Sequence, residues 1–135
     1  MPLLDWGPEL SVNIEVIDEQ HKKLIDNINM LHDAMKEGKG KDVLSKIFDG
    51  LVEYAVNHFA TEEGFFYIYD YPQAEEHKKE HENFKSKVRE MKARFEEGRV
   101  GLPIELSDFL RDWLKRHVLD MDRKYGPFLN SKGVF

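Results

Sequence analysis

Histidine placement is the feature of this sequence with the clearest chemical meaning. Five of its six histidines fall on the apolar stripes of predicted helices. A neutral imidazole carries one hydrogen-bond donor and one acceptor, so five of them in a core are costly without a partner. Imidazole is also the commonest protein ligand of metal ions, and the pattern therefore predicts a buried metal site. The candidate ligands are His21, His58, His77, His81 and His117.

Helical spacing groups some of these residues. His81 follows His77 by four residues and Glu62 follows His58 by four, so the side chains of each pair point the same way from their helix. If Glu62 is buried, its carboxylate needs a cation, which a metal ion supplies. The alternative is that Glu62 and Glu63 form an ordinary solvated acidic pair.

A second carboxylate fits the pattern less simply. Asp122 follows His117 by five residues, which on a regular α-helix places the two side chains about 140° apart. A ligand role for Asp122 therefore requires a local distortion near the helix end, or a metal ion between the two directions. Periodicity alone does not separate Asp122 from Asp120.

The number of candidate ligands exceeds what one four-coordinate ion needs. Five imidazoles and two carboxylates suit two six-coordinate ions that share the carboxylates. A bridging oxide or hydroxide fills further positions, and one position stays open for another ligand. A zinc-stabilised bundle with no redox role is the alternative.

Four helical segments carry these residues, and glycines or prolines separate them. The short connections make neighbouring helices antiparallel, so the sequence predicts an all-α, up-down-up-down four-helix bundle. The bundle is expected to form a single domain, residues 1–135. The predicted helices span about 18–37, 42–69, 72–97 and 103–125.

The remaining segments are expected to be irregular N- and C-terminal arms, residues 1–16 and 128–135, that pack across the bundle. Among the helical stripes, the second is expected to end with Phe65 and the fourth with Met121. Gly64 is unusual inside a helix, and we expect it to permit close approach of a neighbouring helix.

Composition excludes several classes of protein. The 135 residues include no cysteine, which rules out disulfides, thiolate metal sites and iron–sulfur clusters. A formal net charge of −6 argues against a nucleic-acid partner. No apolar stretch is long enough to span a membrane and no secretory leader is visible, so we expect a cytoplasmic protein without a membrane partner.

The ordered set of motifs resembles the hemerythrin family, and in particular its single-domain bacterial branch. The resemblance extends over almost the whole chain, from Trp6 to Phe128. A single HxxxH motif is weak evidence, whereas seven ligands in the same order are specific. The matching motifs are Asp18-x-Gln20-His21, His58-Phe59-x-x-Glu62-Glu63, His77-x-x-x-His81, Trp113-x-x-x-His117-x-x-x-x-Asp122 and Tyr125-Gly126-Pro127-Phe128.

The resemblance implies two iron ions with an oxo or hydroxo bridge. One iron would take His77, His81 and His117, the other would take His21 and His58 and keep an open position, and Glu62 and Asp122 would bridge both. Dioxygen would bind reversibly as hydroperoxide at the open iron, for oxygen storage or transport, in a protein that is not an enzyme. By match to the family's pocket, the oxygen pocket would be formed by Leu24, Phe59, Trp113, Leu114 and Val118.

Other functions of such a site stay open at this point. Ferritin-like oxidases use Glu-x-x-His pairs, and this sequence has none, which favours an oxygen carrier. An oxygen or redox sensor acting on an unknown protein partner is one alternative, and an enzyme that handles peroxide or nitric oxide is another. After Glu63 the sequence departs from the family, and we expect the aromatics of Gly64-Phe65-Phe66-Tyr67 to narrow the pocket.

Overall fold

The computed structural model describes residues 6–98 and 101–135, apart from the side chains of residues 41 and 42. These residues are almost entirely helical, and no strand occurs among them. The last long helix changes its winding partway and continues towards the C-terminus. The elements are η1 (Pro8–Leu10), α1 (Glu15–Lys36), α2 (Gly40–Tyr69), α3 (Ala74–Glu96), α4 (Leu102–Trp113), the π-helix η2 (Leu114–Asp122) and α5 (Arg123–Ser131).

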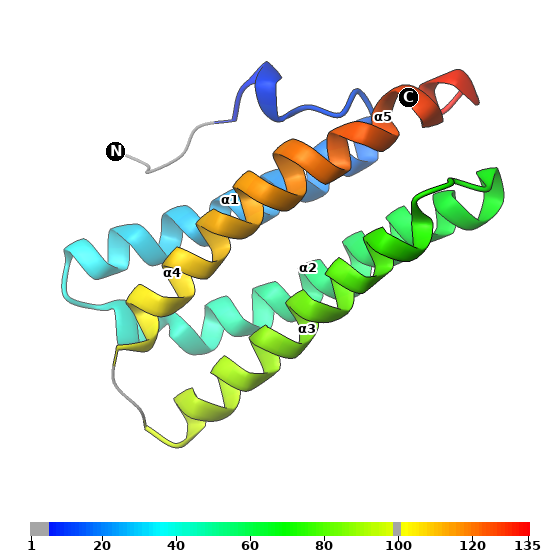
Figure 1. Ribbon diagram of the computed structural model, residues 1–135. Helices are drawn as coiled ribbons and strands as arrows, with labels where there is room; N and C mark the ends of the chain where they lie inside the picture. The colour runs from blue at the N-terminus through cyan, green and yellow to red at the C-terminus, as the bar shows by residue number, and fades with distance from the viewer. Residues whose placement is uncertain (1–5, 99–100) are drawn as a thin grey trace.

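The long helices form an antiparallel four-helix bundle, which confirms the predicted fold class. In Figure 1, α1 lies beside α4 and α2 lies beside α3, with sequence neighbours running in opposite directions. Contacts join α1 to α2, α2 to α3, α3 to α4 and α4 back to α1. The site residues of four different segments can therefore meet along the axis between the helices.

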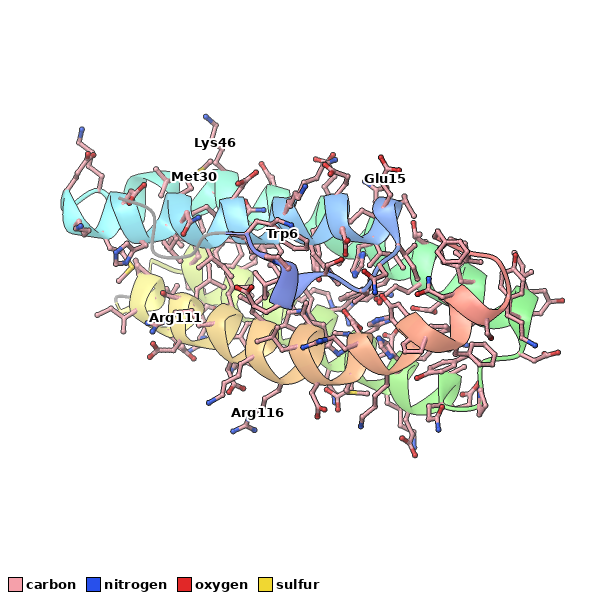
Figure 2. All side chains as sticks on the ribbon, turned by 90° about the horizontal axis from the view of Figure 1, so that it is seen from above. Trp6, Glu15, Met30, Lys46, Arg111 and Arg116 are labelled. Atoms are coloured by element: carbon pink, nitrogen blue, oxygen red, sulfur yellow. The ribbon has the colours of Figure 1, made fainter. Side chains whose placement is uncertain are left out.

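Apolar residues fill the interior and charged side chains cover the outside. In Figure 2, Glu15, Lys46, Arg111 and Arg116 point away from the bundle axis. Two apolar clusters occupy the core. The larger one includes Leu24, Leu51, Phe59, Phe84, Leu110, Trp113 and Val118. The smaller one consists of Val12, Ile14, Ile17, Phe66, Tyr71, Tyr125 and Leu129.

The segment before α1 is tied to that helix by Asp18. The carboxylate of Asp18 accepts a hydrogen bond from the Val12 backbone N–H at 2.9 Å and another from the Ser11 hydroxyl at 2.5 Å. Leu10, Val12 and Ile14 of the same segment are buried. Asp18, a residue of the family motif, therefore fastens the N-terminal segment over the bundle.

The predicted arms are partly wrong. Residues 8–10 form a short 3₁₀-helix, and helix continues through Pro127 to Ser131 although an irregular arm was expected from residue 128. Pro127 is exposed, so water can bind the helix carbonyl that loses its donor, and burial of Tyr125 and Leu129 favours the helix. Residues 1–5 of the expected N-terminal arm lie outside the described residues.

The other helix boundaries differ by a few residues from the expectation. The first helix begins at Glu15, the second at Gly40 and the third at Ala74, two residues after Pro72. At the end of α2, Asp70 takes a left-handed conformation with φ of 53°, which turns the chain before Pro72.

Gly126 lies where the N-terminal segment crosses α5. A Cβ atom at this position would lie 2.8 Å from the Val12 carbonyl oxygen, which is backbone and cannot easily move aside. We expect Gly126→Ala to lower the free energy of unfolding by about 1–3 kcal/mol, because the Val12 segment must shift. Urea unfolding followed by circular dichroism measures this change.

Gly64 supplies the matched control, and its structure corrects an expectation. A Cβ atom at Gly64 would meet no described atom within 4 Å, so Gly64 is not a point of close helix approach. Because it lies inside α2, Gly64→Ala should raise the free energy of unfolding by about 0.5–1 kcal/mol. Equal effects of the Gly64 and Gly126 substitutions would contradict this account of the crossing.

Candidate metal centre

All seven candidate ligands lie inside the bundle, and none is more than 1% exposed. Each of the four long helical segments of the bundle contributes at least one ligand. α1 carries one, α2 carries two, α3 carries two and the π-helix η2 carries two. In that order they are His21, His58, Glu62, His77, His81, His117 and Asp122.

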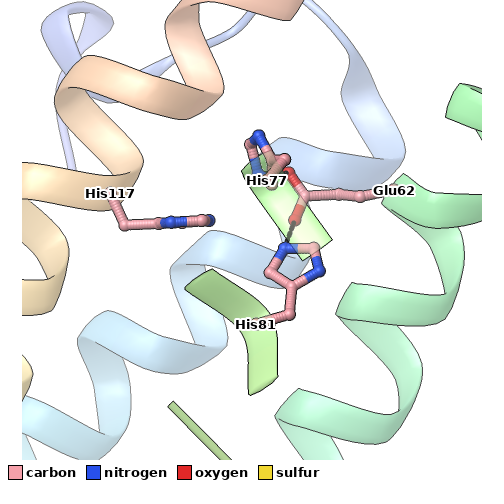
Figure 3. Close-up of side chains that lie close together, drawn as sticks. All are labelled: Glu62, His77, His81 and His117. Atoms are coloured by element: carbon pink, nitrogen blue, oxygen red, sulfur yellow. Dashed lines mark hydrogen bonds and ion pairs between the residues drawn. The ribbon is translucent and has the colours of Figure 1, made fainter. Parts of the chain in front are cut away.

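The first group of ligands surrounds one side of the two carboxylates. The Nε2 atom of His81 lies 3.0 Å from Oε1 of Glu62. The Nε2 atoms of His77 and His117 lie 2.7 and 3.0 Å from Oδ1 of Asp122. Figure 3 shows the three imidazoles of this group converging from α3 and η2 on the Glu62 carboxylate.

The second group uses the same carboxylates from the other side. The Nε2 atom of His21 lies 2.9 Å from Oδ2 of Asp122, and that of His58 lies 3.1 Å from Oε1 of Glu62. The Nε2 atoms of His21 and His58 are themselves 3.0 Å apart. Glu62 and Asp122 therefore each contact both groups, which is the division that the family resemblance implies.

Several of these short contacts are not hydrogen bonds. His77 Nε2 and Asp122 Oδ1 are close, yet both are buried without a hydrogen-bond partner, as are His117 Nε2, Glu62 Oε2 and Asp122 Oδ2. Buried polar atoms without partners are rare, and here the ligand atoms form two groups, in each of which all of them lie within 4.8 Å of one another, close enough to hold an ion. Metal ions held by these groups would satisfy them, so the residues present fit a metal centre, and imidazole with carboxylate suits iron.

The ionisation of the two buried carboxylates also favours a metal centre. Burial and the Asp122 carboxylate raise the pKa of Glu62, but His58 and His81 outweigh them, and the net pKa is lowered. Burial also opposes ionisation of Asp122, while contacts with His117, His21 and His77 hold its pKa well below the usual range.

The imidazoles of His58 and His77 respond differently to this setting. Burial lowers the pKa of His58, which keeps the ring neutral. Burial likewise lowers the pKa of His77, but close contact with the Asp122 carboxylate and the negative charges of Glu62 and Asp122 raise it overall. A metal ion would take the place of this proton, so metal binding should release protons.

The local distortion required by Asp122 is present. Residues 114–122 form a π-helix, in which hydrogen bonds connect residues five apart, so His117 and Asp122 share a face. Asp122 is fully buried, whereas Asp120 is exposed and Met121 is half-buried. The structure thus selects Asp122, and the expectation that Met121 continues the apolar stripe is wrong.

Aromatic rings hold three of the imidazoles in place. Trp113 stacks on His117 and Phe59 stacks on His81, each at 3.9 Å between ring centroids. Tyr54 stacks on His58 at 5.0 Å.

Two tyrosines near the ligands were not among the predicted site residues. Tyr54 precedes His58 by four residues, and this spacing was the signal that could have found it. Tyr125 is fully buried, and burial together with the Glu62 and Asp122 carboxylates raises the pKa of its hydroxyl. Tyr125 follows Asp122 by three residues and belongs to the Tyr125-Gly126-Pro127-Phe128 motif, and these were the signals that could have found it.

Two further polar residues contact the outer ring nitrogens. Glu63 Oε2 lies 2.9 Å from Nδ1 of His81, and Gln20 Oε1 lies 2.7 Å from Nδ1 of His58. The alternative in which Glu62 and Glu63 form a solvated pair is therefore wrong, since Glu62 is buried and Glu63 is bonded to a candidate ligand.

All five candidate pocket residues are buried in the larger core cluster: Leu24, Phe59, Trp113, Leu114 and Val118. The aromatics that follow Gly64 do not join them. Phe66 packs against His77 and Tyr125, Phe65 is partly buried at the smaller cluster, and Tyr67 is 88% exposed. The expectation that these aromatics narrow the pocket is wrong, because the end of α2 faces the smaller cluster.

Within the described part of the chain, every helix is too short or too polar to cross a membrane.

Comparison with known proteins identifies the family. The sequence model of the hemerythrin HHE cation-binding domain family matches residues 12–129. Bacteriohemerythrin of Pseudomonas paraeruginosa is 39% identical over 126 residues, covering 93% of this chain and 80% of that protein. Bacteriohemerythrin of Methylococcus capsulatus is 32% identical over 132 residues, covering 97% and 100%. A crystal structure of wild-type hemerythrin has a TM-score of 0.82 at 32% identity and covers 93% of this chain and 96% of its own.

Proposed function

This chain belongs to the hemerythrin family, and we propose that it binds dioxygen reversibly at a pair of iron ions, for oxygen storage or transport, without acting as an enzyme. The observation that carries the proposal is the pair of buried carboxylates, each in contact with both histidine groups. Such carboxylates can hold two ions side by side. A cytoplasmic location and a protein partner that receives the oxygen remain predictions.

The protein residues would share the two ions unequally. His77, His81 and His117 would hold one ion, while His21 and His58 would hold the other. Glu62 and Asp122 would bridge them, with an oxide or hydroxide as a further bridge. Iron bound there would supply electrons to dioxygen and recover them when it is released.

The half with two histidines has fewer protein donors, so an external ligand is expected there. The five candidate pocket residues are buried in the larger core cluster, and two of them, Phe59 and Trp113, stack on candidate ligands. Apolar side chains beside the site would limit the entry of water and protons. Limited proton entry favours release of oxygen over its further reduction.

Optical spectroscopy tests the proposal directly. The protein is loaded with iron and reduced in the absence of oxygen. Its visible spectrum is recorded three times: before oxygen is added, after oxygen is added, and after oxygen is removed again. A carrier gains an absorption band with oxygen and loses it when oxygen is removed. Continuous oxygen consumption, or turnover of peroxide or nitric oxide, would instead show an enzyme, and purification with zinc alone would remove the oxygen claim.

Leu114 is the pocket residue whose substitution we expect to change oxygen chemistry most clearly. Leu114 is 5% exposed at the start of η2, and truncation to alanine opens space for water. We expect Leu114→Ala to speed autoxidation on the order of tenfold, as if the barrier fell by about 1.4 kcal/mol. Decay of the oxygenated spectrum measures the rate.

Leu119→Ala is the matched control. Leu119 lies on the same π-helix, but it is only partly buried and packs against the larger cluster. Its autoxidation rate should stay close to that of the unmodified protein. If the two variants autoxidise at equal rates, Leu114 does not guard the site.

A further inference from the structure

The outer nitrogens of two candidate ligands, one in each half of the site, have partners of different charge. His81, in the three-histidine half, has the Glu63 carboxylate at its Nδ1, 2.9 Å away. His58, in the two-histidine half, has the neutral Gln20 amide at its Nδ1, 2.7 Å away. The two halves therefore differ in the charge of the group that contacts a histidine Nδ1 atom, as well as in the number of histidines.

Glu63 is positioned to make His81 a stronger ligand for a metal ion. The His81 ring is fully buried, while the Glu63 side chain is 29% exposed, so Glu63 connects the ring to the outside of the bundle. Phe59 lies flat on the ring at an interplanar angle of 7°, and Glu62 contacts Nε2. A carboxylate that accepts the Nδ1–H proton of a metal-binding imidazole fixes its tautomer and raises its basicity.

Gln20 is oriented by a chain of hydrogen bonds. The Thr61 hydroxyl donates to the Asn57 carbonyl at 2.8 Å, so its oxygen accepts from the Gln20 amide nitrogen at 3.0 Å. The amide oxygen of Gln20 is then left to accept from Nδ1–H of His58. With the proton on Nδ1, the Nε2 lone pair of His58 is free for a metal ion, and the group that contacts Nδ1 is uncharged.

His21 and His117 do not cancel this difference. Nδ1 of His21 and Nδ1 of His117 are both buried without a hydrogen-bond partner. Gln20 and Thr61 line a groove of about 600 Å³ between α1 and α2, which reaches His58 from outside. No carboxylate contacts Nδ1 of either His21 or His58 in the described residues.

We propose that Glu63 and Gln20 are positioning residues that set the reduction potentials of the two irons apart, with the Glu63 carboxylate favouring the ferric state at the ion held by His77, His81 and His117. The neutral Gln20 amide leaves the ion held by His21 and His58 less favourable to oxidise. This inference rests on the proposed di-iron function, and it concerns which ion loses its electron first.

Isosteric charge changes test the proposal. Spectroelectrochemistry of the iron-loaded protein without oxygen, in which one electron passes between the electrode and the site at each step, measures both potentials. Glu63→Gln should raise the potential of the ion that is oxidised first by about 59 mV, the equivalent of a tenfold loss of ferric preference. Gln20→Glu should lower the potential of the other ion by a similar amount. Asp49→Asn, which removes an exposed charge from the same helix, should shift neither.

Equal shifts in the Glu63→Gln and Asp49→Asn variants would overturn the proposal, since the effect would then be one of net charge. Nitrogen NMR of the metal-free protein gives an independent readout. The Nδ1–H tautomer of His81 should predominate in the unmodified protein. It should fall in Glu63→Leu but not in Asp49→Leu, and an unchanged tautomer in Glu63→Leu would also overturn the proposal. Loss of reversible oxygen binding with these shifts intact would contradict the proposed function alone.

Discussion

Glu62→Ala is expected to remove metal from both halves of the site. Glu62 Oε1 lies 3.0 Å from His81 Nε2 and 3.1 Å from His58 Nε2, so one truncation withdraws a donor from each half. Substitution of residues that merely contact a ligand costs about 10–100-fold in metal affinity, and loss of a bridging ligand should cost on the order of 100-fold or more. Iron per protein, measured by plasma mass spectrometry after exposure to a chelator, should fall from two to near zero.

The control for Glu62 is Glu53→Ala, an exposed glutamate on the same helix that should keep both ions. Circular dichroism checks that each variant is folded. Retention of two irons by folded Glu62→Ala protein would show that Glu62 does not join the two halves.

Asp122→Ala should have an effect of similar size, and relocation of the carboxylate tests the role of the π-helix. Moving the carboxylate one residue earlier, in the double variant Met121→Asp/Asp122→Ala, gives the four-residue spacing from His117 that suits a regular α-helix. Because residues 114–122 are a π-helix and Met121 is turned partly outward, this variant should lose iron as severely as Asp122→Ala.

The single variant Met121→Asp, which keeps Asp122, is the control and should retain two irons. Recovery of iron binding in the double variant would mean that the winding of η2 adapts to the carboxylate, and that the π-helix does not select Asp122.

Residue type and periodicity predicted the greater part of the fold. Apolar stripes with a helical repeat placed all five histidines of the site on faces that do point inward. Glu62 followed from the same repeat, because α2 is regular around His58. Glycine and proline predicted most helix ends to within a few residues.

The same reasoning failed where the chain leaves regular α-helical winding. The repeat of 3.6 residues placed Met121 on the inner face of the fourth helix, but the π-helix turns Asp122 inward instead. Only the conflict between the spacing and the ligand role signalled this distortion. Pro127 likewise suggested a helix end, although burial of Tyr125 and Leu129 keeps the chain helical.

Residues that act through another residue were also invisible to spacing. Gln20 reaches His58 from a different helix, and Glu63 reaches His81 in the same way. Each of these contacts depends on the rotation of one helix against another, which is decided by packing of the whole core.

Anomalous X-ray diffraction from crystals of the iron-loaded protein, recorded on either side of the iron absorption edge, locates the ions themselves. A two-iron site predicts two iron peaks inside the bundle. One should be bound by His77, His81 and His117, the other by His21 and His58, and both by Glu62 and Asp122. A single peak, peaks without these residues around them, or a signal that appears only at the zinc edge would contradict it.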